Sequence, residues 1–243
     1  MTSSLDQAPP LDVAVANTAA FWTLLAQTRG HRLTTRPGFV CVHGSERSGM
    51  RIVLRTGTPD AEDVAELTKL AENAARVVVE DAYGTVDLSA LGLKPRELPV
   101  MARTAAASTV DIPDVVRADT PEQLATVENV VVHGFPLERH QPYRRGEVFP
   151  PALLDRDDVE LYLTERDGEP AGACFVVLDG TAAGVYWVTT LPAKRSRGVG
   201  RSLMNAMLSR LDGLPITLTA SKAGKPLYDS LGFSTLASSV WWA

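Results

Sequence analysis

The sequence has little cysteine, little histidine and no long apolar run, and each shortage excludes a class of protein. Its two cysteines, Cys41 and Cys174, are too few for a disulfide framework and indicate a reducing compartment. Its four scattered histidines have no zinc-ligand spacing. No window approaches the roughly 18 to 20 consecutive apolar residues that span a bilayer, and the N-terminus resembles no targeting signal. We therefore expect a cytoplasmic protein that binds no metal and no membrane.

The sequence also lacks an excess of positive charge. Its formal net charge of -5 argues against nonspecific binding to nucleic acid. With 45% hydrophobic and 22% charged residues, the composition is that of a folded globular protein, which excludes a collagen, a coiled coil and a fully disordered chain. At about 150 residues per domain, the chain of 243 residues corresponds to one or two domains.

Acidic residues are absent from residues 180–211, although basic residues gather there. The basic residues are Lys194, Arg195, Arg197, Arg201 and Arg210. A charge cluster is usually a solvated helix face. Here, however, Gly198 and Gly200 lie inside the cluster, between a strand predicted to end at Thr190 and a helix predicted to end at Leu211. Glycines let the backbone approach a ligand, and the N–H groups of a first helical turn favour an anion. The segment therefore predicts a phosphate-binding loop.

Two nucleotide-binding patterns do not fit this loop. A dinucleotide GxGxxG pattern needs a third glycine, but Leu203 stands there, and the ribose-binding acid about 20 residues further on is replaced by Ala220. A GxxxxGK[ST] phosphate loop is also absent, because Gly224 and Lys225 are followed by Pro226. The sequence therefore contains neither of these nucleotide-binding motifs.

Two motifs in the C-terminal half resemble a known family. The segment VYWVTTLPAKRSRGVGRSLM, followed by TASKAGKPLYDSLGF, is similar to the acetyl-CoA-binding core of the GNAT family of N-acetyltransferases. The family's R/QxxGxG/A pattern falls on Arg195, Gly198 and Gly200, and its YxxxGF pattern ends at Gly232 and Phe233. The resemblance covers about residues 111–242. It implies an α/β (α+β) GNAT fold, in which helices flank a mixed, largely antiparallel twisted sheet.

The resemblance also implies roles for individual residues. Backbone N–H groups of residues 196–201 would hold the pyrophosphate of acetyl-CoA, with charge from two arginines, and residues 188–191 would pair with pantetheine and leave one N–H as an oxyanion donor. The implied cofactor-binding residues are Val188, Thr189, Thr190, Leu191, Arg195, Ser196, Arg197, Gly198, Val199, Gly200, Arg201 and Ser221. Tyr228 would be the catalytic acid that protonates the leaving thiolate. Ser221 departs from the family, which often has Asn at this position.

The general base is not identified by the motifs. Many relatives use a carboxylate on the central strand, but residues 184–190 contain none. Candidates elsewhere are Glu138, His140 and Glu147 in the irregular segment 134–151, and Glu160 on a neighbouring strand. Residues of these types are more often surface groups than bases. A water relay or an amine that is already neutral would serve as well.

The chain divides in sequence into residues 1–108 and a GNAT domain, residues 109–243, joined by a linker of small residues at 105–109. In the N-terminal part we expect a helix capped by Asn17, three short strands, and a second helix capped by Thr58 with Pro59 at its first position. This order repeats that of the C-terminal half. One hypothesis is therefore a degenerate second GNAT-like unit in a tandem arrangement, and the other is an unrelated α+β extension. Carboxylates of Asp60, Glu62 and Asp63 would repel a pyrophosphate there.

Further signals place elements of the C-terminal half. Thr120 and Gln123 have the spacing of a capping box. Asp167 and Gly168 have the composition of a hairpin turn, and residues 239–242 are expected to form a closing strand.

The function implied by the resemblance is transfer of an acetyl group from acetyl-CoA, as co-substrate, to a primary amine. The preferred acceptor is a small molecule, a metabolite or an antibiotic, because the aromatic segment 134–151 suggests a pocket. The amine would attack the thioester directly in a ternary complex. The alternatives are acetylation of a protein N-terminus or lysine, and a non-catalytic CoA-binding protein. A monomer or a homodimer is expected.

Overall fold

The computed structural model describes residues 9–104, 114–135, 137–211 and 213–243. The predicted linker at 105–109 and most of the predicted N-terminal tail lie outside these ranges. Contacts divide the chain into two compact units, which we call unit 1 and unit 2. The described part of unit 1 lies within residues 104–216, and unit 2 comprises residues 8–103 and 217–243. Each unit is described by itself.

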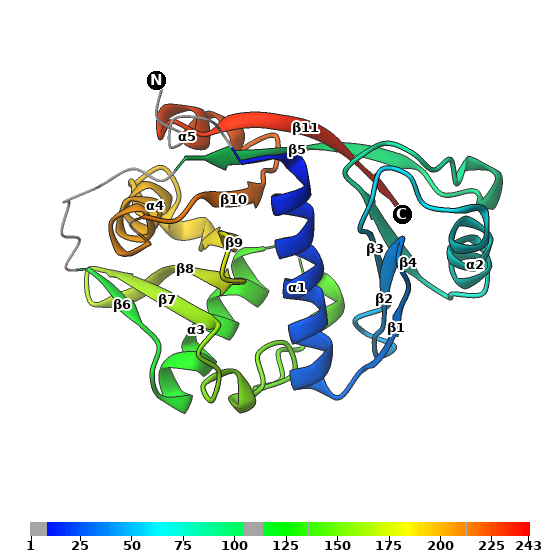
Figure 1. Ribbon diagram of the computed structural model, residues 1–243. Helices are drawn as coiled ribbons and strands as arrows, with labels where there is room; N and C mark the ends of the chain where they lie inside the picture. Colours follow the sequence, from blue (N-terminus) through cyan, green and yellow to red (C-terminus); the bar gives the residue numbers. More distant parts are fainter. Residues whose placement is uncertain (1–8, 105–113, 136, 212) are drawn as a thin grey trace, which may run out of the picture. The chain divides into compact units, whose positions relative to one another are not determined.

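Unit 1 is built on a four-stranded antiparallel sheet between two helices. In spatial order its strands are β9 (Ala183–Thr190), β8 (Glu169–Leu178), β7 (Val159–Arg166) and β6 (Val115–Arg117). Helices α3 (Pro121–Gly134) and α4 (Val199–Arg210) lie on opposite sides of this sheet (Figure 1). Short 3-10 helices occupy Glu138–His140, Pro151–Leu153 and Pro192–Lys194.

Local signals in unit 1 form as the sequence predicts. The Thr120 side chain accepts a hydrogen bond from the Gln123 backbone N–H, and the Gln123 side chain accepts one from the Thr120 N–H, so the capping box is confirmed. Asp167 and Gly168 have positive φ angles of 59° and 74°, as a tight hairpin turn of the right-handed sheet twist requires. That turn brings the start of β8 back beside the end of β7.

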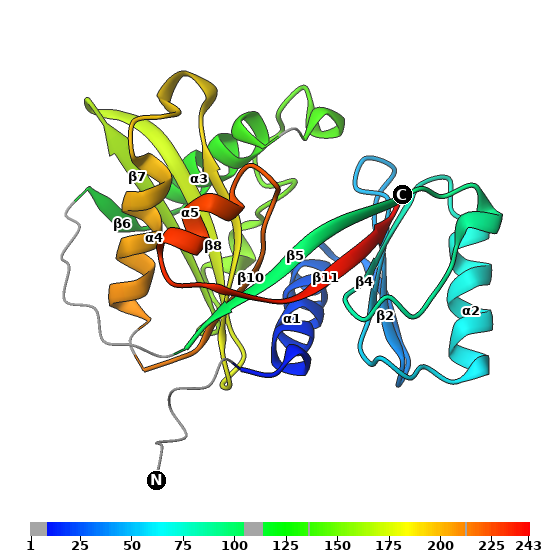
Figure 2. The same cartoon turned by 90° about the horizontal axis from the view of Figure 1, so that it is seen from above.

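The strands of unit 2 pair in a mixed, parallel and antiparallel arrangement. Its elements are α1 (Leu11–Arg29), β1 (Arg32–Thr35), β2 (Phe39–His43), β3 (Met50–Leu54), α2 (Ala61–Glu72), β4 (Val77–Asp81), a 3-10 helix (Ser89–Leu91), β5 (Pro95–Arg103), α5 (Lys225–Ser230) and β11 (Ser234–Trp242). The strand order is β1-β2-β3-β4-β11-β5, and the β3–β4 pair is parallel. Figure 2 shows β11 running beside β5 over its length. Strand β10 (Ile216–Thr219) contains the boundary between the units.

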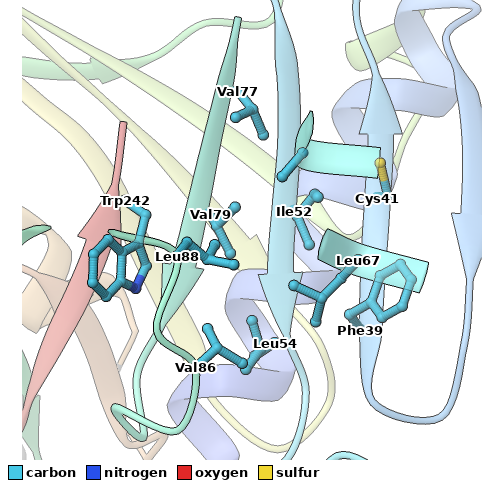
Figure 3. Packing of buried hydrophobic residues seen from close by; sticks show 11 residues of the cluster. Phe39, Cys41, Ile52, Leu54, Leu67, Val77, Val79, Val86, Leu88 and Trp242 are labelled. Carbon is cyan, nitrogen blue, oxygen red and sulfur yellow. The ribbon is translucent and has the colours of Figure 1, made fainter. Parts of the chain in front are cut away.

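The core of unit 2 lies on both faces of its sheet because successive residues of a strand point to opposite faces. Phe39, Cys41, Ile52 and Leu54 join the cluster that packs against Leu67 of α2 (Figure 3). Residues between them, such as Val40 and Val53, pack with Ala19 of α1 on the other face.

Three predicted element ends are wrong. Helix α1 begins at Leu11, not at Asn17, and Asn17 is fully buried within it. Helix α2 is capped by Asp60 and not by Thr58, because the Asp60 carboxylate accepts a hydrogen bond from the Asp63 backbone N–H at 2.7 Å. The closing strand begins at Ser234 rather than Ser239, since β11 pairs with β5 from its first residue.

The contact units differ from the sequence division at residue 108. Because β11 pairs with β5 and β4, the C-terminal residues 217–243 pack with the N-terminal half. The order helix, three strands, helix, strand occurs from α1 to β4 and again from α3 to β10. The tandem hypothesis rests on this shared order and stays a hypothesis.

Candidate active site

A β-bulge interrupts β9 at the start of the predicted cofactor strand. Tyr186 pairs with Phe175 and Thr189 pairs with Ala173, so two residues, Trp187 and Val188, lie opposite a single residue of β8. Trp187 has a φ of 48°, a left-handed conformation that is uncommon for a bulky residue. Such strain gathers at functional sites, and a bulge disrupts the regular ladder and redirects the strand.

Aromatic rings pack around the bulge. The Phe149 ring centroid lies 5.2 Å from that of Trp187 and 5.4 Å from that of Phe175. The Phe175 and Trp187 rings meet edge-on with centroids 6.3 Å apart. Phe149 belongs to the irregular segment 134–151, so this cluster fastens that segment to the bulge.

The glycine loop leads from β9 into the N-terminus of α4. Ser196 and Gly198 both have left-handed φ angles, 60° and 79°. Gly198 is the N-cap of α4, which has no side-chain hydrogen bond at this cap within the described residues. Residues 195–198 are exposed, and a Cβ built on Gly198 meets no heavy atom within 4 Å. There is therefore open space beside Gly198 at the N-terminus of a 12-residue helix, which fits the diphosphate of a coenzyme A.

Helix α2 of unit 2 begins with the opposite chemistry. Besides the Asp60 cap, the Arg36 guanidinium forms ion pairs with Glu62, Asp63 and Glu66. The hydrogen bonds that Arg36 donates to the carboxylates of Asp63 and Glu62 raise the pKa of Arg36. This helix end is occupied by the chain's own carboxylates, as the sequence predicts, and it offers no comparable anion site.

The basic residues of the loop are partly engaged by the protein. Arg195 donates from Nη2 to the Gly134 carbonyl at 2.9 Å and from Nε to the Thr190 carbonyl at 3.4 Å, so it braces the loop against the end of α3. Lys194 pairs with Glu169 at 2.8 Å, and this hydrogen bond lowers the pKa of Glu169. Arg197, whose side chain is 57% exposed, lies 4.0 Å from Asp167.

These contacts correct one inference from the sequence. The segment is free of acids along the chain, but the β7–β8 hairpin places Asp167 and Glu169 beside it in space. Arg197, with more than half of its side chain exposed, is better placed than Arg195 to face a ligand.

Two glycines that the motifs do not include allow close packing around the cofactor strand. A Cβ on Gly134, at the end of α3, would lie 2.3 Å from Thr189 Cγ2. A Cβ on Gly172 of β8 would lie 2.6 Å from Val199 Cγ1 and 2.8 Å from the Thr189 carbonyl oxygen. Both helices thus approach the strand as closely as they do because these positions lack a side chain.

Glu128 is a buried residue that sequence reasoning missed. Its carboxylate accepts hydrogen bonds from the backbone N–H groups of Gly146, Val148 and Phe149 and from the Tyr143 hydroxyl, at 2.7 to 3.0 Å. Burial and the hydrogen bond from its hydroxyl to Glu128 raise the pKa of Tyr143. The only signal in the sequence was an acidic residue next to the apolar face of the predicted helix.

The candidate bases differ in what they contact. Glu160 accepts hydrogen bonds from the Tyr162 hydroxyl at 2.6 Å and from Arg117 at 3.2 Å. Burial raises the pKa of Tyr162, and the Glu160 hydrogen bond adds to that shift. Glu138 is exposed. His140 is buried, and its Nδ1 lies 3.6 Å from Glu147 Oε1.

Tyr228 and Ser221 belong to unit 2, whereas the other predicted site residues belong to unit 1. Tyr228 is buried on α5, and its ring meets Phe233 edge-on with centroids 5.8 Å apart. Ser221 Oγ accepts a hydrogen bond from the Gly224 N–H at 3.0 Å. A Cβ on Gly224 would lie 3.2 Å from both Ser221 Oγ and Tyr228 Cε2, so the turn needs glycine to hold the tyrosine close. Gly232 follows the helix with a φ of 82°, as predicted for its end.

A pocket of about 590 Å³ opens on unit 1. Its lining includes residues from the irregular segment, α3, β8 and the predicted cofactor strand. They are Tyr143, Arg145, Asn129, Glu169 and Leu191. Its volume is within the range of roughly 300 to 1,000 Å³ that holds small ligands.

Other chemistries find little support in the described residues. Both cysteines are buried, and burial raises the pKa of the Cys174 thiol to about 12, so it is a poor nucleophile near neutral pH. The described ranges hold no group of three or more His, Cys, Asp or Glu residues that could bind a metal ion. Within the same ranges, no helix is long and apolar enough to cross a bilayer.

Comparisons with known proteins give a domain family and similar folds. The family model of the acetyltransferase (GNAT) domain matches residues 157–235. A search of curated proteins gives no sequence match. Among solved structures, the chain is similar to a GNAT-family structure from Novosphingobium aromaticivorans, with 16% identity, coverage of 96% of this chain and 97% of the other, and a TM-score of 0.67. A GCN5-related N-acetyltransferase from Kribbella flavida is 16% identical, with coverage of 92% and 94% and a TM-score of 0.58. An acetyltransferase of the GNAT family from Colwellia psychrerythraea is 13% identical, with coverage of 96% and 93% and a TM-score of 0.53. These likenesses span both units and concern the fold.

Proposed function

We propose that this chain, whose residues 157–235 match the acetyltransferase (GNAT) domain, transfers an acetyl group from acetyl-CoA to a primary amine of a small molecule. The observation that carries this proposal is the exposed glycine loop at the start of α4, which directly follows a bulged strand. The loop fits a diphosphate, and the bulge in the adjoining strand supports a thioester site beside it.

Binding of the donor is assigned to the loop and strand of unit 1. N–H groups of residues 196–201 would hold the diphosphate, Arg197 would add charge, and Arg195 would keep the loop in place. Residues 188–191 would pair with the pantetheine arm. A backbone N–H beside the bulge would then donate to the carbonyl oxygen as negative charge develops on it.

The reaction forms a C–N bond and breaks a C–S bond, and one proton leaves nitrogen while one is added to sulfur. The neutral amine nitrogen attacks the thioester carbonyl, the C–N bond forms, the C–S bond breaks to release a thiolate, and the nitrogen gives one proton to water, from which the acid is protonated again. Tyr228 would donate its phenolic proton to that sulfur. The chain's main contribution is the alignment of two substrates in a ternary complex.

The pocket on unit 1 supports a small-molecule acceptor. It has the volume of a ligand site and combines the Tyr143, Arg145 and Asn129 side chains with the Glu169 carboxylate. Leu191 connects this pocket to the strand assigned to the donor.

The test is release of free thiol from acetyl-CoA, followed with a chromogenic disulfide reagent, across a panel of amines. The panel contains small primary amines, a peptide with a free N-terminus and a lysine peptide. Both protein cysteines are buried and do not contribute background. We expect release with at least one small amine. Release with peptides alone would move the assignment to protein acetylation, and tight CoA binding without any release would identify a non-catalytic protein.

A matched pair of variants tests Tyr228. Tyr228→Phe should keep CoA affinity and lower kcat, because only the proton donor is removed. Tyr83→Phe is the control, since Tyr83 donates to Asp12 in unit 2 and lies outside the proposed site. An unchanged kcat for Tyr228→Phe would assign the acid to another group.

A further inference from the structure

We infer that the acceptor amine also carries a carboxylate, as an amino acid does, and that Arg145 binds this carboxylate in the pocket on unit 1. The inference rests on the proposed function and names the substrate class of its acceptor site. It is carried by the contacts of two charged side chains in the pocket wall, Arg145 and Glu169.

The guanidinium of Arg145 makes its protein contacts through a single nitrogen. Nη2 donates to the Pro121 carbonyl at 3.0 Å and lies 3.4 Å from Glu122 Oε1. Nε and Nη1 have no hydrogen-bond partner in the part of the chain that the structure describes. A guanidinium holds its donors in a planar fork whose geometry matches a carboxylate. Arg145 therefore gives the pocket donors that a carboxylate of the substrate can use.

The ion pair between Arg145 and Glu122 is a weak competitor for a substrate. The Glu122 side chain is 78% exposed and that of Arg145 is 57% exposed. Ion pairs between exposed side chains contribute little, because water and salt screen them. A substrate carboxylate has the same chemistry as Glu122 and can take its place, while the hydrogen bond to the Pro121 carbonyl keeps the guanidinium beside the pocket.

The acidic side chain in the pocket wall, Glu169, is already paired by the protein. Lys194 Nζ donates to Glu169 Oε2 at 2.8 Å, and the Lys194 side chain is only 14% exposed. This hydrogen bond lowers the pKa of Glu169, so the carboxylate stays ionised and paired near neutral pH. Because a cation is held against it, the charge of Glu169 repels a substrate carboxylate only weakly.

Two uncharged residues of the same pocket suit the two ends of an amino acid. Asn129 of α3 is exposed, and its side-chain amide makes no hydrogen bond with the described residues, so it offers a second donor to a carboxylate. Leu191, which directly follows β9, lines the pocket as well. A small molecule can therefore place its carboxylate at Arg145 while its amine faces the strand assigned to the donor.

An amine with a second positive charge is less suitable for this pocket. Its second cation would lie near the guanidinium of Arg145 and the ammonium of Lys194, and like charges repel. The carboxylates of Glu122 and Glu169 are each already paired with one of these two cations. The pocket therefore favours an amine whose second group is anionic.

The experiment compares substrates that differ only in the charge of the second group. Thiol release gives kcat/KM for the common amino acids, 4-aminobutyrate and 6-aminohexanoate, each beside its carboxamide, in the wild type, Arg145→Gln and the control Arg144→Gln. Arg144 is an exposed neighbour that does not line the pocket. We expect the wild type to favour at least one amino acid over its amide by about 10- to 100-fold, mainly through a lower KM, since hydrogen bonds between charged groups are among the stronger ones. Arg145→Gln should lose most of this preference, and Arg144→Gln should keep it.

Three results would overturn the inference and leave the proposed function intact. The first is thiol release with small amines that shows no preference for an amino acid over its amide. The second is a preference that Arg145→Gln retains as fully as Arg144→Gln. The third is a loss of CoA affinity in Arg145→Gln, measured by calorimetry, which would place Arg145 at the donor.

Thermal melting checks that both variants fold. If Arg145→Gln does not fold, Arg145→Lys replaces it, and this variant should lower the preference because it keeps the charge without the fork. Absence of thiol release in the wild type with every amine would instead contradict the proposed function, and the inference with it.

Discussion

Arg195 Nη2 donates to the carbonyl oxygen of Gly134 at a distance of 2.9 Å, so the first residue of the glycine motif is hydrogen-bonded to the last residue of α3. The motif arginine therefore has a structural partner that the sequence does not show. Its neighbour Arg197 has its side chain 57% exposed. The two arginines should respond differently to substitution.

Replacing Arg195 should affect both stability and cofactor binding. Arg195→Met removes a charged donor from the Gly134 carbonyl and should lower the free energy of unfolding by about 1 to 2 kcal/mol. It should also weaken CoA binding about tenfold, because the loop loses its brace. Arg197→Met should weaken CoA binding with little change in stability. Urea unfolding and calorimetric titration with CoA measure both quantities, and equal destabilisation by the two variants would contradict the brace.

Gly198 and Gly180 form a matched pair for the loop conformation. Both have positive φ angles, 79° and 84°, and a Cβ on either meets nothing within 4 Å. Alanine at each position should therefore cost about 1 kcal/mol of backbone strain. Only Gly198→Ala should reduce CoA affinity, because Gly180 lies in the remote β8–β9 turn. Equal CoA affinity in the two variants would place the diphosphate elsewhere.

The contact between Gly134 and Thr189 can be tested by compensation. Gly134→Ala places a Cβ against Thr189 Cγ2 and should destabilise by about 1 to 3 kcal/mol through overpacking. Thr189→Ser removes that methyl and keeps the hydroxyl that donates to the Trp187 carbonyl at 2.7 Å. The double variant should recover more than half of the loss in thermal or urea unfolding. Purely additive effects would show that the clash is relieved in another way.

Glu80 gives unit 2 a pH dependence with a definite sign. Burial raises the pKa of Glu80 from its ordinary value of 4.5, although Arg51 and the Trp22 indole N–H act in the opposite direction. Above pH 4.5 the folded state then binds more protons than the unfolded state, so its free energy of unfolding falls as pH rises toward the folded pKa. The free energy of unfolding of the wild type minus that of Glu80→Gln, measured in urea, should therefore decrease with rising pH. If this signed difference increases with pH, the Arg51 pair outweighs burial.

Most of the fold could be predicted because its local signals agree with the tertiary structure. The Thr120 capping box and the Asp167–Gly168 turn each place their element correctly. The errors occur where a partner distant in the sequence determines the end of an element. Strand β11 extends to Ser234 because β5 is available for pairing, and periodicity within residues 234–238 does not show that partner.

The motifs of the site could be predicted from the sequence, but the contacts that hold the motif residues in place could not. Glycines and arginines at fixed spacing identify the loop between β9 and α4. Contacts distant in sequence, such as Arg195 with Gly134 and Glu128 with residues 146–149, leave no spacing that a motif could capture. The bulge at Trp187 is likewise not predicted by the sequence pattern, because the surrounding structure and not the residue type determines where it forms.

Hydrogen exchange of backbone amides, measured with and without CoA, tests whether the glycine loop holds the diphosphate. We expect slower exchange at Val199, Gly200 and Arg201 in the first turn of α4 when CoA is added. The first turn of α2, residues 61–63, serves as the internal comparison, because Asp60 and Arg36 already occupy that helix end. Its exchange should not change. Protection at α2, or none at α4 with CoA bound, would contradict the assignment of the glycine loop as the diphosphate site.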